Sequence, residues 1–385
     1  MNIQLERVSA CTLNRIFGYT PEIPQRILSC FGSFSGIFDL NAREIESFLG
    51  RRGSLSHLVS RQELDRSSAE LARLEGRGIR FVSFGEPGYP PLLAECQDAP
   101  AGLYILSKDS PEELFRNTGI SVVGTRDMSP YGKDWCARIV AGLSSARAAV
   151  SIVSGLAIGI DRTAHCTALE YGAATIAVLP TDIEHIYPYA HRQLAERIAS
   201  GDGCALISDF PPGTSPQAVT FIRRNRIIAG MSRATILVES RKKGGGMITA
   251  RLASDYGRDV FVLPGRIDDL RSEGCNILLA EKLAEPIVSV PALATCLGLA
   301  CRAKKEDFRK RVADFYTGIL PAGEALEFAA VADAVRKERG ITVSGICERL
   351  GWDYGKVSGI TGILESDSFI DIDLQQRCTI NCKNS

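Results

Sequence analysis

Seven short apolar runs, rich in β-branched residues, recur between residues 79 and 265 and alternate with segments of helical periodicity. The runs read IRFVSF, ISVVGTR, VSIVSG, TIAVLP, CALISDF, ATILVES and DVFVLPG, and the helical segments lie at 129–146, 159–172, 191–200 and 245–257. Strands that are apolar throughout indicate a parallel sheet that helices cover on both faces. The pattern predicts an α/β fold with a doubly wound, mostly parallel sheet. Its ligand is expected at the carboxyl ends of the strands.

The chain before this core has a different composition. Residues 1–66 place apolar residues at helical spacing between glycine-containing turns, and Asn41 is positioned to cap a helix. Residues 1–65 carry seven basic and seven acidic residues, which favours packing or protein contact over DNA binding. We therefore expect a small helical domain over residues 1–66, followed by the α/β core over residues 67–300.

The chain after the core reads helix, glycine-containing turn, helix and then FIDIDL, which alternates like a wing strand. This order predicts a winged-helix domain over residues 305–385. Residues 304–385 carry 12 basic and 13 acidic residues, whereas a DNA-reading winged helix is basic on its recognition face. A structural or protein-contact role is therefore favoured over duplex binding, and both remain open.

Cysteine spacing and hydropathy exclude several classes of protein. Twelve cysteines are scattered from Cys11 to Cys382 without a CxxC pair, which favours reduced thiols over a metal site, and we expect neither a metal nor a cofactor. The N-terminal MNIQLERVSACTL lacks the apolar segment of a signal peptide. The most apolar run, residues 148–160, is too short for a membrane span. We expect a cytoplasmic protein.

Positive charge is concentrated in one window of a chain whose formal net charge is zero. Residues 221–258 contain nine basic and two acidic residues, and they surround the expected strand ATILVES. A local positive patch at strand ends is expected to attract phosphates. The alternative is a solvated face that acidic residues elsewhere neutralise.

The segment RKKGGGMITA adds a glycine-rich turn to this charge. Lys242 and Lys243 precede the turn, and Gly245 and Gly246 stand where a helix is expected to begin. Glycine lets backbone N–H groups approach a phosphate, and a helix N-terminus supplies free donors. The segment matches neither a Walker A loop nor GxGxxG.

Two further strand ends carry candidate contacts. Arg126 follows one strand, and Ser154 and Gly155 end another. Asp161 and His165, four residues apart, share a helix face. We interpret this pair as structural rather than catalytic, because the preceding VSGLAIG is not a nucleophile elbow.

The stretch FIRRNRIIAG, residues 221–230, places three arginines among apolar residues. At 100° per residue, Arg223, Arg226 and Gly230 share one polar face, which we expect to contact phosphates. Arg224 falls among isoleucines and should be a buried brace with a carboxylate or backbone carbonyl partner. Phe221 could stack on a base or pack in the core, and both interpretations stay open.

Together these segments resemble the DprA/Smf family of DNA-processing proteins. The match covers about 210 residues in the family's order, with motifs YPPLLAECQDAPAGLY, VVGTRDMSPYG, VSGLAIGIDRTAH, ISDFPPGTSP, FIRRNRIIAGMS, GGGMITARLA and VFVLPGRIDDLRSEGCN. The resemblance implies sequence-independent binding and protection of single-stranded DNA, loading of the RecA recombinase during natural transformation, and no established catalytic activity. It also implies that the core is an extended Rossmann-like domain through which a homodimer forms, with an N-terminal domain of the SAM or helix-hairpin-helix type and a C-terminal winged helix.

By position, the resemblance implies a DNA pocket made of Arg126, Ser154, Gly155, Phe221, the Arg224-Asn225-Arg226 motif and the loop from Lys242 to Thr249. Two departures affect its rim. Ile158 stands where many members have Lys or Arg, and Pro180, Thr181 and Asp182 stand where many read GSGLD. The neighbouring Lys242 and Lys243 are candidates to replace the charge lost at position 158.

Two other classes of function compete with this interpretation. Related Rossmann-like phosphoribohydrolases cleave nucleoside monophosphates with a glutamate in a PGGxGTxxE loop, but the corresponding GGGMITARLA has Arg251 and no glutamate. A transcriptional regulator acting through the winged helix is the third candidate. Release of base from nucleotides would support the enzyme, and tight duplex binding by residues 305–385 would support the regulator.

Overall fold

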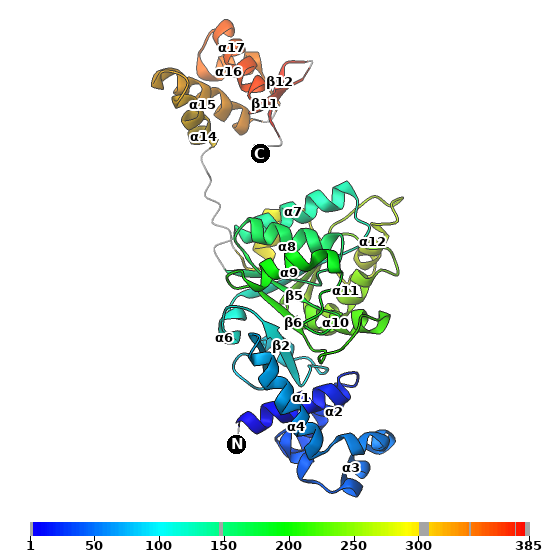
Figure 1. Ribbon diagram of the computed structural model, residues 1–385. Coiled ribbons are helices and arrows are strands. Elements are labelled where there is room, and N and C mark those ends of the chain that lie inside the picture. The colour runs from blue at the N-terminus through cyan, green and yellow to red at the C-terminus, as the bar shows by residue number, and fades with distance from the viewer. Residues whose placement is uncertain (1–2, 146–148, 300–307, 339, 374, 382–385) are drawn as a thin grey trace. The chain divides into compact units, whose positions relative to one another are not determined.

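A computed structural model describes residues 3–145, 149–299, 308–338, 340–373 and 375–381 of the chain (Figure 1). The chain divides into two compact units, Met1–Cys301 and Arg302–Ser385. In the part of the chain that is described, no helix is long and apolar enough to cross a membrane. Every cysteine described is a free thiol; Cys30 and Cys296 are exposed, and the others are buried or half-buried.

A nine-stranded sheet forms the centre of the larger unit, in the order β1-β2-β6-β5-β4-β3-β7-β8-β9. The strands from β6 to β9 run parallel in that order, while β1 and β2 pair antiparallel with each other and β2 pairs antiparallel with β6. The α/β class and the mostly parallel sheet are thus confirmed. The bounds are β1 Ile79–Ser83, β2 Gly102–Leu106, β3 Thr118–Val123, β4 Val150–Ser154, β5 Ala174–Val178, β6 Ala205–Ser208, β7 Ala234–Leu237, β8 Asp259–Val262 and β9 Glu285–Pro286.

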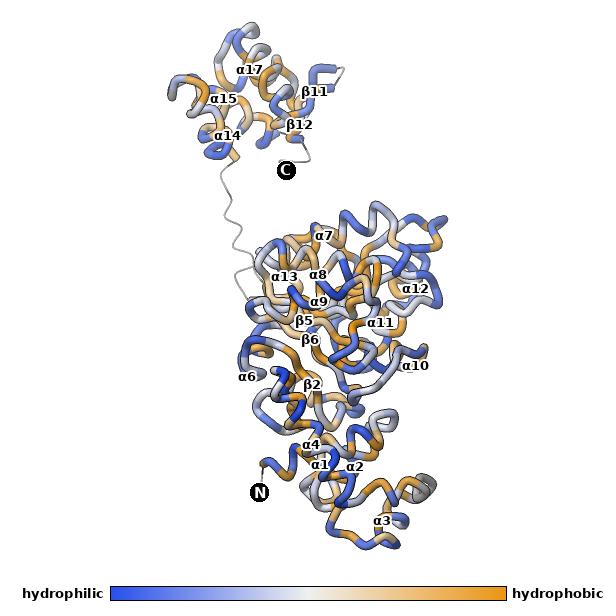
Figure 2. The backbone as a smooth tube through the Cα atoms, in the orientation of Figure 1, coloured by the Kyte–Doolittle hydropathy of each residue, from blue (hydrophilic) through white to orange (hydrophobic). Residues whose placement is uncertain are grey.

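Helices cover both faces of the sheet. Neighbouring residues of a strand point to opposite faces, and on these strands both sets are apolar and need cover. Val122 and Ile152 pack with α7, α8 and α13, whereas Val123 and Val153 pack with α5, α10, α11 and α12. Figure 2 shows apolar residues along β2, β5 and β6 at the centre of this unit. The bounds are α5 Pro91–Ala94, α6 Pro111–Leu114, α7 Pro130–Ser144, α8 Ile160–Glu170, α9 Arg192–Ala199, α10 Ala218–Gly230, α11 Gly245–Asp255, α12 Glu273–Ala280 and α13 Val290–Cys296.

Side-chain caps mark the start of two helices, and the cap at Asn41 is the one that the sequence predicts. The Ser129 hydroxyl accepts a hydrogen bond from the Gly132 N–H at 3.0 Å, with Pro130 at the first position of α7. Asn41 caps α3, Ala42–Leu49, and Glu44 completes a capping box. These caps satisfy N–H groups that have no partner within the helix.

Two N-terminal helices, α1 Ile3–Phe17 and α4 Arg61–Glu75, contact β1 at the end of the sheet, while α2 Glu22–Phe31 packs against α1 and α3 joins the same apolar cluster. Leu13 and Phe17 of α1 share one apolar cluster with Tyr104 of β2 and Leu206 of β6. These helices therefore belong to the same compact unit as the sheet.

The smaller unit has its own apolar core, which includes Val335, Ile346, Val357 and Leu364. Its helices are α14 Phe308–Thr317, α15 Ala322–Lys337, α16 Val343–Leu350 and α17 Tyr354–Ser366. Its sheet has the order β10-β12-β11, with β10 Ile341–Thr342, β11 Ile370–Ile372 and β12 Arg377–Ile380. Gly351 ends α16 at φ 69°, a conformation that favours glycine, and the Asp353 side chain caps α17.

Candidate nucleic-acid interface

A cavity of about 380 Å³ opens at the carboxyl ends of β3, β4 and β7. Within the sheet, β4 lies on one side of β3 and β7 lies on the other, so the order of the strands reverses at β3. Ligands of doubly wound folds bind at such a point, because the loops diverge there and leave a crevice. The loops after these three strands and one side of α10 line the cavity.

Most of the residues proposed from the sequence meet in this cavity. Its lining includes Arg126, Phe221, Arg224, Asn225, Lys243, Gly245, Gly246 and Thr249. Gly155 lines a smaller hollow beside it, together with Arg126 and Phe221. Ser154, Arg223, Arg226 and Lys242 lie outside both linings.

Arg126 and Tyr187 both contact the Phe221 ring in the smaller hollow beside the cavity. The Arg126 guanidinium carbon lies 4.9 Å from the Phe221 ring centre, and the Tyr187 ring lies 5.4 Å from the same centre, edge-on. Arg126 and Tyr187 are exposed, and Phe221 is half-buried. The half-buried ring keeps both interpretations of Phe221 open. Tyr187 was missed by sequence reasoning, although the aromatic pair in HIYPY after β5 was a usable signal.

The glycine run lies at the start of α11, beside the cavity, and its three glycines differ in their surroundings. Gly244 precedes the helix in extended conformation, and a Cβ on Gly245 would meet no atom within 4 Å. A Cβ on Gly246 would lie 2.6 Å from the Leu237 side chain and 3.4 Å from the Gly124 Cα. Gly245 is therefore open to a ligand, whereas Gly246 is required for packing.

Asn225 and Thr249 hold the first turn of α11 in place. The Asn225 side-chain amide and the Thr249 hydroxyl each donate to the Gly245 carbonyl at 3.4 Å. Both side chains are buried. Ser154 is also buried, and its hydroxyl donates to the Val122 carbonyl at 2.7 Å. These three residues shape the loops around the cavity through backbone contacts.

Arg224 is the brace that the helical phase predicts. It is 4% exposed, and its guanidinium donates to the Gly155 carbonyl at 2.6 Å and to the Val178 carbonyl. Burial lowers the pKa of Arg224 to about 10, against the opposing effect of the Asp161 carboxylate. A Cβ on Gly155 would lie 2.3 Å from an Arg224 nitrogen, so glycine at this strand end admits the guanidinium.

The structure corrects the expectation that Arg223, Arg226 and Gly230 form one accessible face of α10. Arg226 is 5% exposed; it forms an ion pair with Asp209 at 2.5 Å and donates to the Asp98 carbonyl. A Cβ on Gly230 would meet side chains from residues 93 and 96 within 3 Å. The face is closed because segments far away in the sequence pack on α10, which a helical projection does not reveal.

Arg223 faces the N-terminal helices rather than the cavity. Its guanidinium donates to the Tyr19 carbonyl at 2.5 Å and to the Gly18 carbonyl, and lies 4.9 Å from the Tyr19 ring centre. Burial lowers the pKa of Arg223. Arg223 thus connects α10 to the end of α1, and its proposed phosphate contact, like that of Arg226, stays a prediction.

Asp161 and His165 have separate structural partners. The Asp161 carboxylate accepts from the Gly155 and Ala157 N–H groups at 3.1 and 3.4 Å, and burial raises its pKa. His165 Nδ1 lies 2.7 Å from the Thr175 hydroxyl, and burial lowers the pKa of His165 to about 3. These separate partners favour the structural interpretation of the pair, which stays a prediction.

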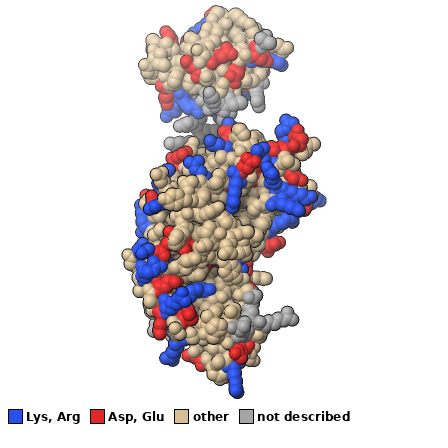
Figure 3. Space-filling view, turned by 45° about the vertical axis from the view of Figure 1, so that its right-hand side comes forward, with Lys and Arg blue, Asp and Glu red and all other residues tan. Residues whose placement is uncertain are grey.

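The positive window is partly neutralised. Arg241 reaches the Asp127 carboxylate at 3.5 Å, and Arg251 pairs with Glu281 at 2.8 Å. Arg271, outside the window, also reaches Asp127, at 3.1 Å. Figure 3 shows Lys and Arg side chains gathered on the right-hand side of the larger unit, at the level of α11 and α12.

Three cations in or next to the cavity have no ion-pair partner among the described residues. Arg126, Lys242 and Lys243 are exposed, and within the described ranges the structure records no ion pair for them. Within the described ranges, no three His, Cys, Asp or Glu side chains are grouped closely enough to hold a metal ion.

The two departures at the rim have clear structural consequences. Ile158 is 53% exposed beside Arg126, in the smaller hollow. The buried Asp182 accepts from the Gly213 N–H at 2.7 Å and from the Glu184 N–H at 2.9 Å. Asp182 therefore fastens two loops together instead of facing the cavity.

Comparison with known proteins places this geometry in a family. Residues 80–298 match the sequence model of DNA recombination-mediator protein A. Protein Smf of Synechocystis sp. is 37% identical over 255 residues, which cover 66% of this chain and 60% of the relative. DNA processing protein DprA of Streptococcus pneumoniae is 38% identical over 212 residues, covering 54% and 72%. The chain thus spans less than two thirds of the Synechocystis relative's length.

Two solved structures share the fold. The X-ray structure of DprA from Streptococcus pneumoniae has a TM-score of 0.59 at 28% identity, covering 76% of this chain and 95% of that one. DNA processing protein A from Helicobacter pylori, known for its unique single-stranded DNA binding mode, has a TM-score of 0.50 at 28% identity, covering 56% and 95%.

Proposed function

Because the chain belongs to the family of DNA recombination-mediator protein A, we propose that it binds single-stranded DNA at the cavity between β3, β4 and β7. The observation that carries this proposal is the exposed Arg126 stacked on Phe221, next to a helix N-terminus that opens at Gly245. An exposed cation, an aromatic face and free backbone donors together fit a phosphate and a base. None of them selects a base sequence.

Binding follows from two physical contributions. Arg126, Lys242 and Lys243 neutralise phosphates, and the release of counterions makes affinity fall steeply with salt. Phe221 or Tyr187 stacks on a base, which contributes about 1–3 kcal/mol per base. The N-terminal N–H groups of α11 supply neutral donors to a phosphate oxygen.

The site residues divide into contacts and supports. We assign direct contact to Arg126, Phe221, Lys242, Lys243 and Gly245. We assign support of the loops to Ser154, Gly155, Arg224, Asn225, Gly246 and Thr249, because each is buried or held against backbone. Arg223 and Arg226 receive a DNA-facing role only if their present partners are exchanged on binding.

The biological setting is proposed from the family. We propose that the protein shields single-stranded DNA in the cytoplasm, loads the RecA recombinase during natural transformation, and acts without chemistry of its own. A homodimer through the Rossmann-like core belongs to the same proposal. Support comes from relatives named DNA processing protein.

The flanking domains are proposed with the boundaries 1–66, 67–300 and 305–385. A SAM-like or helix-hairpin-helix role for the first and a winged helix for the last rest on the order of their elements. In the last, the Lys356 ammonium lies 2.6 Å from Glu327 and 4.6 Å from the Trp352 ring centre. Lys356 is thus already engaged, which favours protein contact over duplex binding.

The experiment that tests the proposed function compares DNA forms. Anisotropy of a labelled oligothymidylate and of a duplex of equal length is measured with the full chain at two salt concentrations. We expect tighter binding of the single strand and a strong salt dependence. Equal affinity for both forms would sink the proposal, and release of free base from nucleoside monophosphates would favour the enzyme instead.

A further inference from the structure

The sheet ends at β1, and one edge of this strand has no partner strand in the part of the chain that is described. The Phe84 N–H donates to the Ala101 carbonyl at 2.8 Å, so this pair is a hydrogen-bonded pair of the ladder with β2. Such pairs alternate along an antiparallel ladder. The N–H and C=O groups of Ile79 and Phe81 therefore point away from β2.

These backbone groups have no other partner among the described residues. Outside its ladder with β2, the structure records no hydrogen bond to the backbone of Ile79 or Phe81. An unpaired edge presents donors and acceptors at the repeat of an extended chain. Proteins cover such edges or use them to add a strand.

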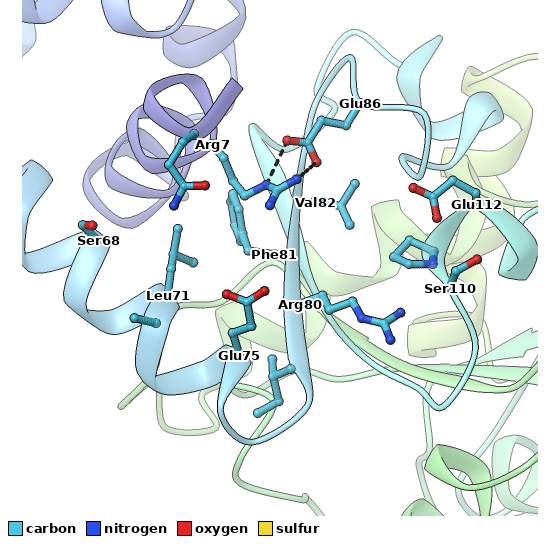
Figure 4. A pocket seen from close by; sticks show the side chains of 14 residues that line it. Arg7, Ser68, Leu71, Glu75, Arg80, Phe81, Val82, Glu86, Ser110 and Glu112 are labelled. Atoms are coloured by element: carbon cyan, nitrogen blue, oxygen red, sulfur yellow. Dashed lines mark hydrogen bonds and ion pairs between the residues drawn. The ribbon is translucent and has the colours of Figure 1, made fainter. Parts of the chain in front are cut away.

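A groove of about 450 Å³ lies along this edge (Figure 4). One wall is α4, with Leu71, Ala72 and Glu75, and the other wall is the segment 110–112 at the start of α6. Figure 4 shows Phe81 pointing from β1 toward the helices and Val82 pointing toward Ser110 and Glu112. The two walls therefore flank the two faces of the strand and leave its edge between them.

One end of the groove is held by an ion pair. Arg7 of α1 donates to both carboxylate oxygens of Glu86, at 3.0 and 3.2 Å. The pair joins α1 to the segment that follows β1, and Figure 4 shows it beside the strand. It fixes the position of α1 relative to the strand.

We propose that the groove along β1 binds an extended polypeptide segment of a partner protein, which pairs with the backbone of Ile79 and Phe81 as an additional strand. Backbone N–H and C=O groups repeat every second residue along both chains, and a nucleic acid lacks this pattern. A second copy of this chain fits poorly, because its own α4 and residues 110–112 would compete for the same space. The bound partner segment is therefore a single extended strand that lies between the two walls.

Charge and polarity define the side chains of this segment. Glu75 and Glu112 are exposed on opposite walls, and the described structure records no ion pair for either. Glu86 is already paired, and Arg80 donates to the Asp109 carbonyl at 2.8 Å. The half-buried Leu71 faces the helical side of the groove. Successive side chains of an extended segment point to opposite walls, so the partner segment places apolar residues against Leu71 and basic residues against Glu112.

The test uses the full chain and a short fluorescein-labelled peptide of alternating valine and lysine. Its control is the same peptide with N-methylated valines, which cannot donate along one edge. We expect the parent protein to bind the first peptide and the N-methylated peptide to bind about tenfold more weakly or worse. Hydrogen exchange of the bound protein should slow at the Ile79 and Phe81 amides.

Two alanines on the exposed side of α4 supply matched variants. Ala72 lines the groove and Ala69 does not, and both are exposed. Ala72→Trp should weaken the peptide by about tenfold, because the indole fills the groove, and Ala69→Trp should leave binding unchanged. Glu112→Lys should weaken the lysine peptide severalfold and favour a peptide of alternating valine and glutamate.

Several outcomes would overturn the proposal. They are equal binding of both peptides, equal binding by the two tryptophan variants, and no binding at the solubility limit of the peptide. Slowed exchange at amides other than those of β1 would do the same. A dimer lost on Ala72→Trp would assign the edge to a second copy of this chain.

Discussion

The Arg126 guanidinium carbon lies 4.9 Å from the centre of the Phe221 ring. The positive charge of the loop after β3 is therefore placed over an aromatic ring of α10. The contact fixes the guanidinium at the mouth of the cavity while its N–H groups stay exposed. A cation placed over a ring is attracted by about 0.5–1 kcal/mol when exposed. The pair can therefore present a phosphate contact and a stacking surface together.

Arg126→Ala should weaken single-strand binding and reduce the slope of log affinity against log salt by about 0.7, one phosphate's share. Phe221→Ala should weaken binding by about 1–3 kcal/mol with the slope unchanged, because stacking releases no counterions. Anisotropy with oligothymidylate measures both. Arg116→Ala, an exposed arginine before the amino end of the same strand, is the matched control. An unchanged slope in Arg126→Ala would remove Arg126 from the site.

Ile158→Lys should restore a phosphate contact at the rim. The side chain is 53% exposed beside Arg126, so a lysine there can extend into solvent at little cost to folding. We expect tighter single-strand binding and a salt slope steeper by about 0.7. Ile3→Lys adds the same charge at an exposed position of α1 and should change neither quantity. If both variants behave alike, the gain reflects net charge and not this site.

Arg226→Ala should act on stability more than on DNA. Its guanidinium is buried in an ion pair with Asp209, and removing one partner of such a pair costs about 3–5 kcal/mol. Urea unfolding measures the loss, and Lys242→Ala, at an exposed side chain, is a control expected to unfold like the parent. Folded Arg226→Ala protein that loses binding without losing stability would return Arg226 to the contacts.

His165 should make the protein less stable in mild acid. Burial lowers its folded pKa to about 3 from the usual 6.5, so below pH 6.5 the unfolded chain takes up a proton that the folded chain refuses. Stability therefore falls as the pH drops, by about 2 kcal/mol between pH 7 and pH 5. Urea unfolding at both pH values should show this loss reduced in His165→Asn and retained in His57→Asn, at an exposed histidine. A full loss in His165→Asn would assign the acid sensitivity elsewhere.

The sequence was informative where one physical signal acts alone. Fully apolar runs identified the parallel strands, since both faces of such strands are buried, and helical phase placed Arg224 among buried residues because its neighbours Ile227 and Ile228 face the core. The same phase misplaced Arg226, whose partner Asp209 and neighbour Asp98 come from other segments. When distant segments of the chain pack on a second face of a helix, the periodicity of the helix's own sequence does not reveal it.

The two glycines that open α11 should separate folding from binding. Gly245→Ala places a Cβ in open space at a position without positive φ, so the fold should keep or slightly gain stability. The added methyl group would nevertheless stand where backbone N–H groups approach a phosphate, so single-strand binding should weaken. Gly246→Ala brings a Cβ to 2.6 Å from the Leu237 side chain, and this overpacking should cost about 1–3 kcal/mol. Thermal unfolding and anisotropy on both variants check the contrast. Parent-like binding by Gly245→Ala would show that the phosphate does not reach this helix end, and the contact assignment would then rest on Arg126 and the two lysines.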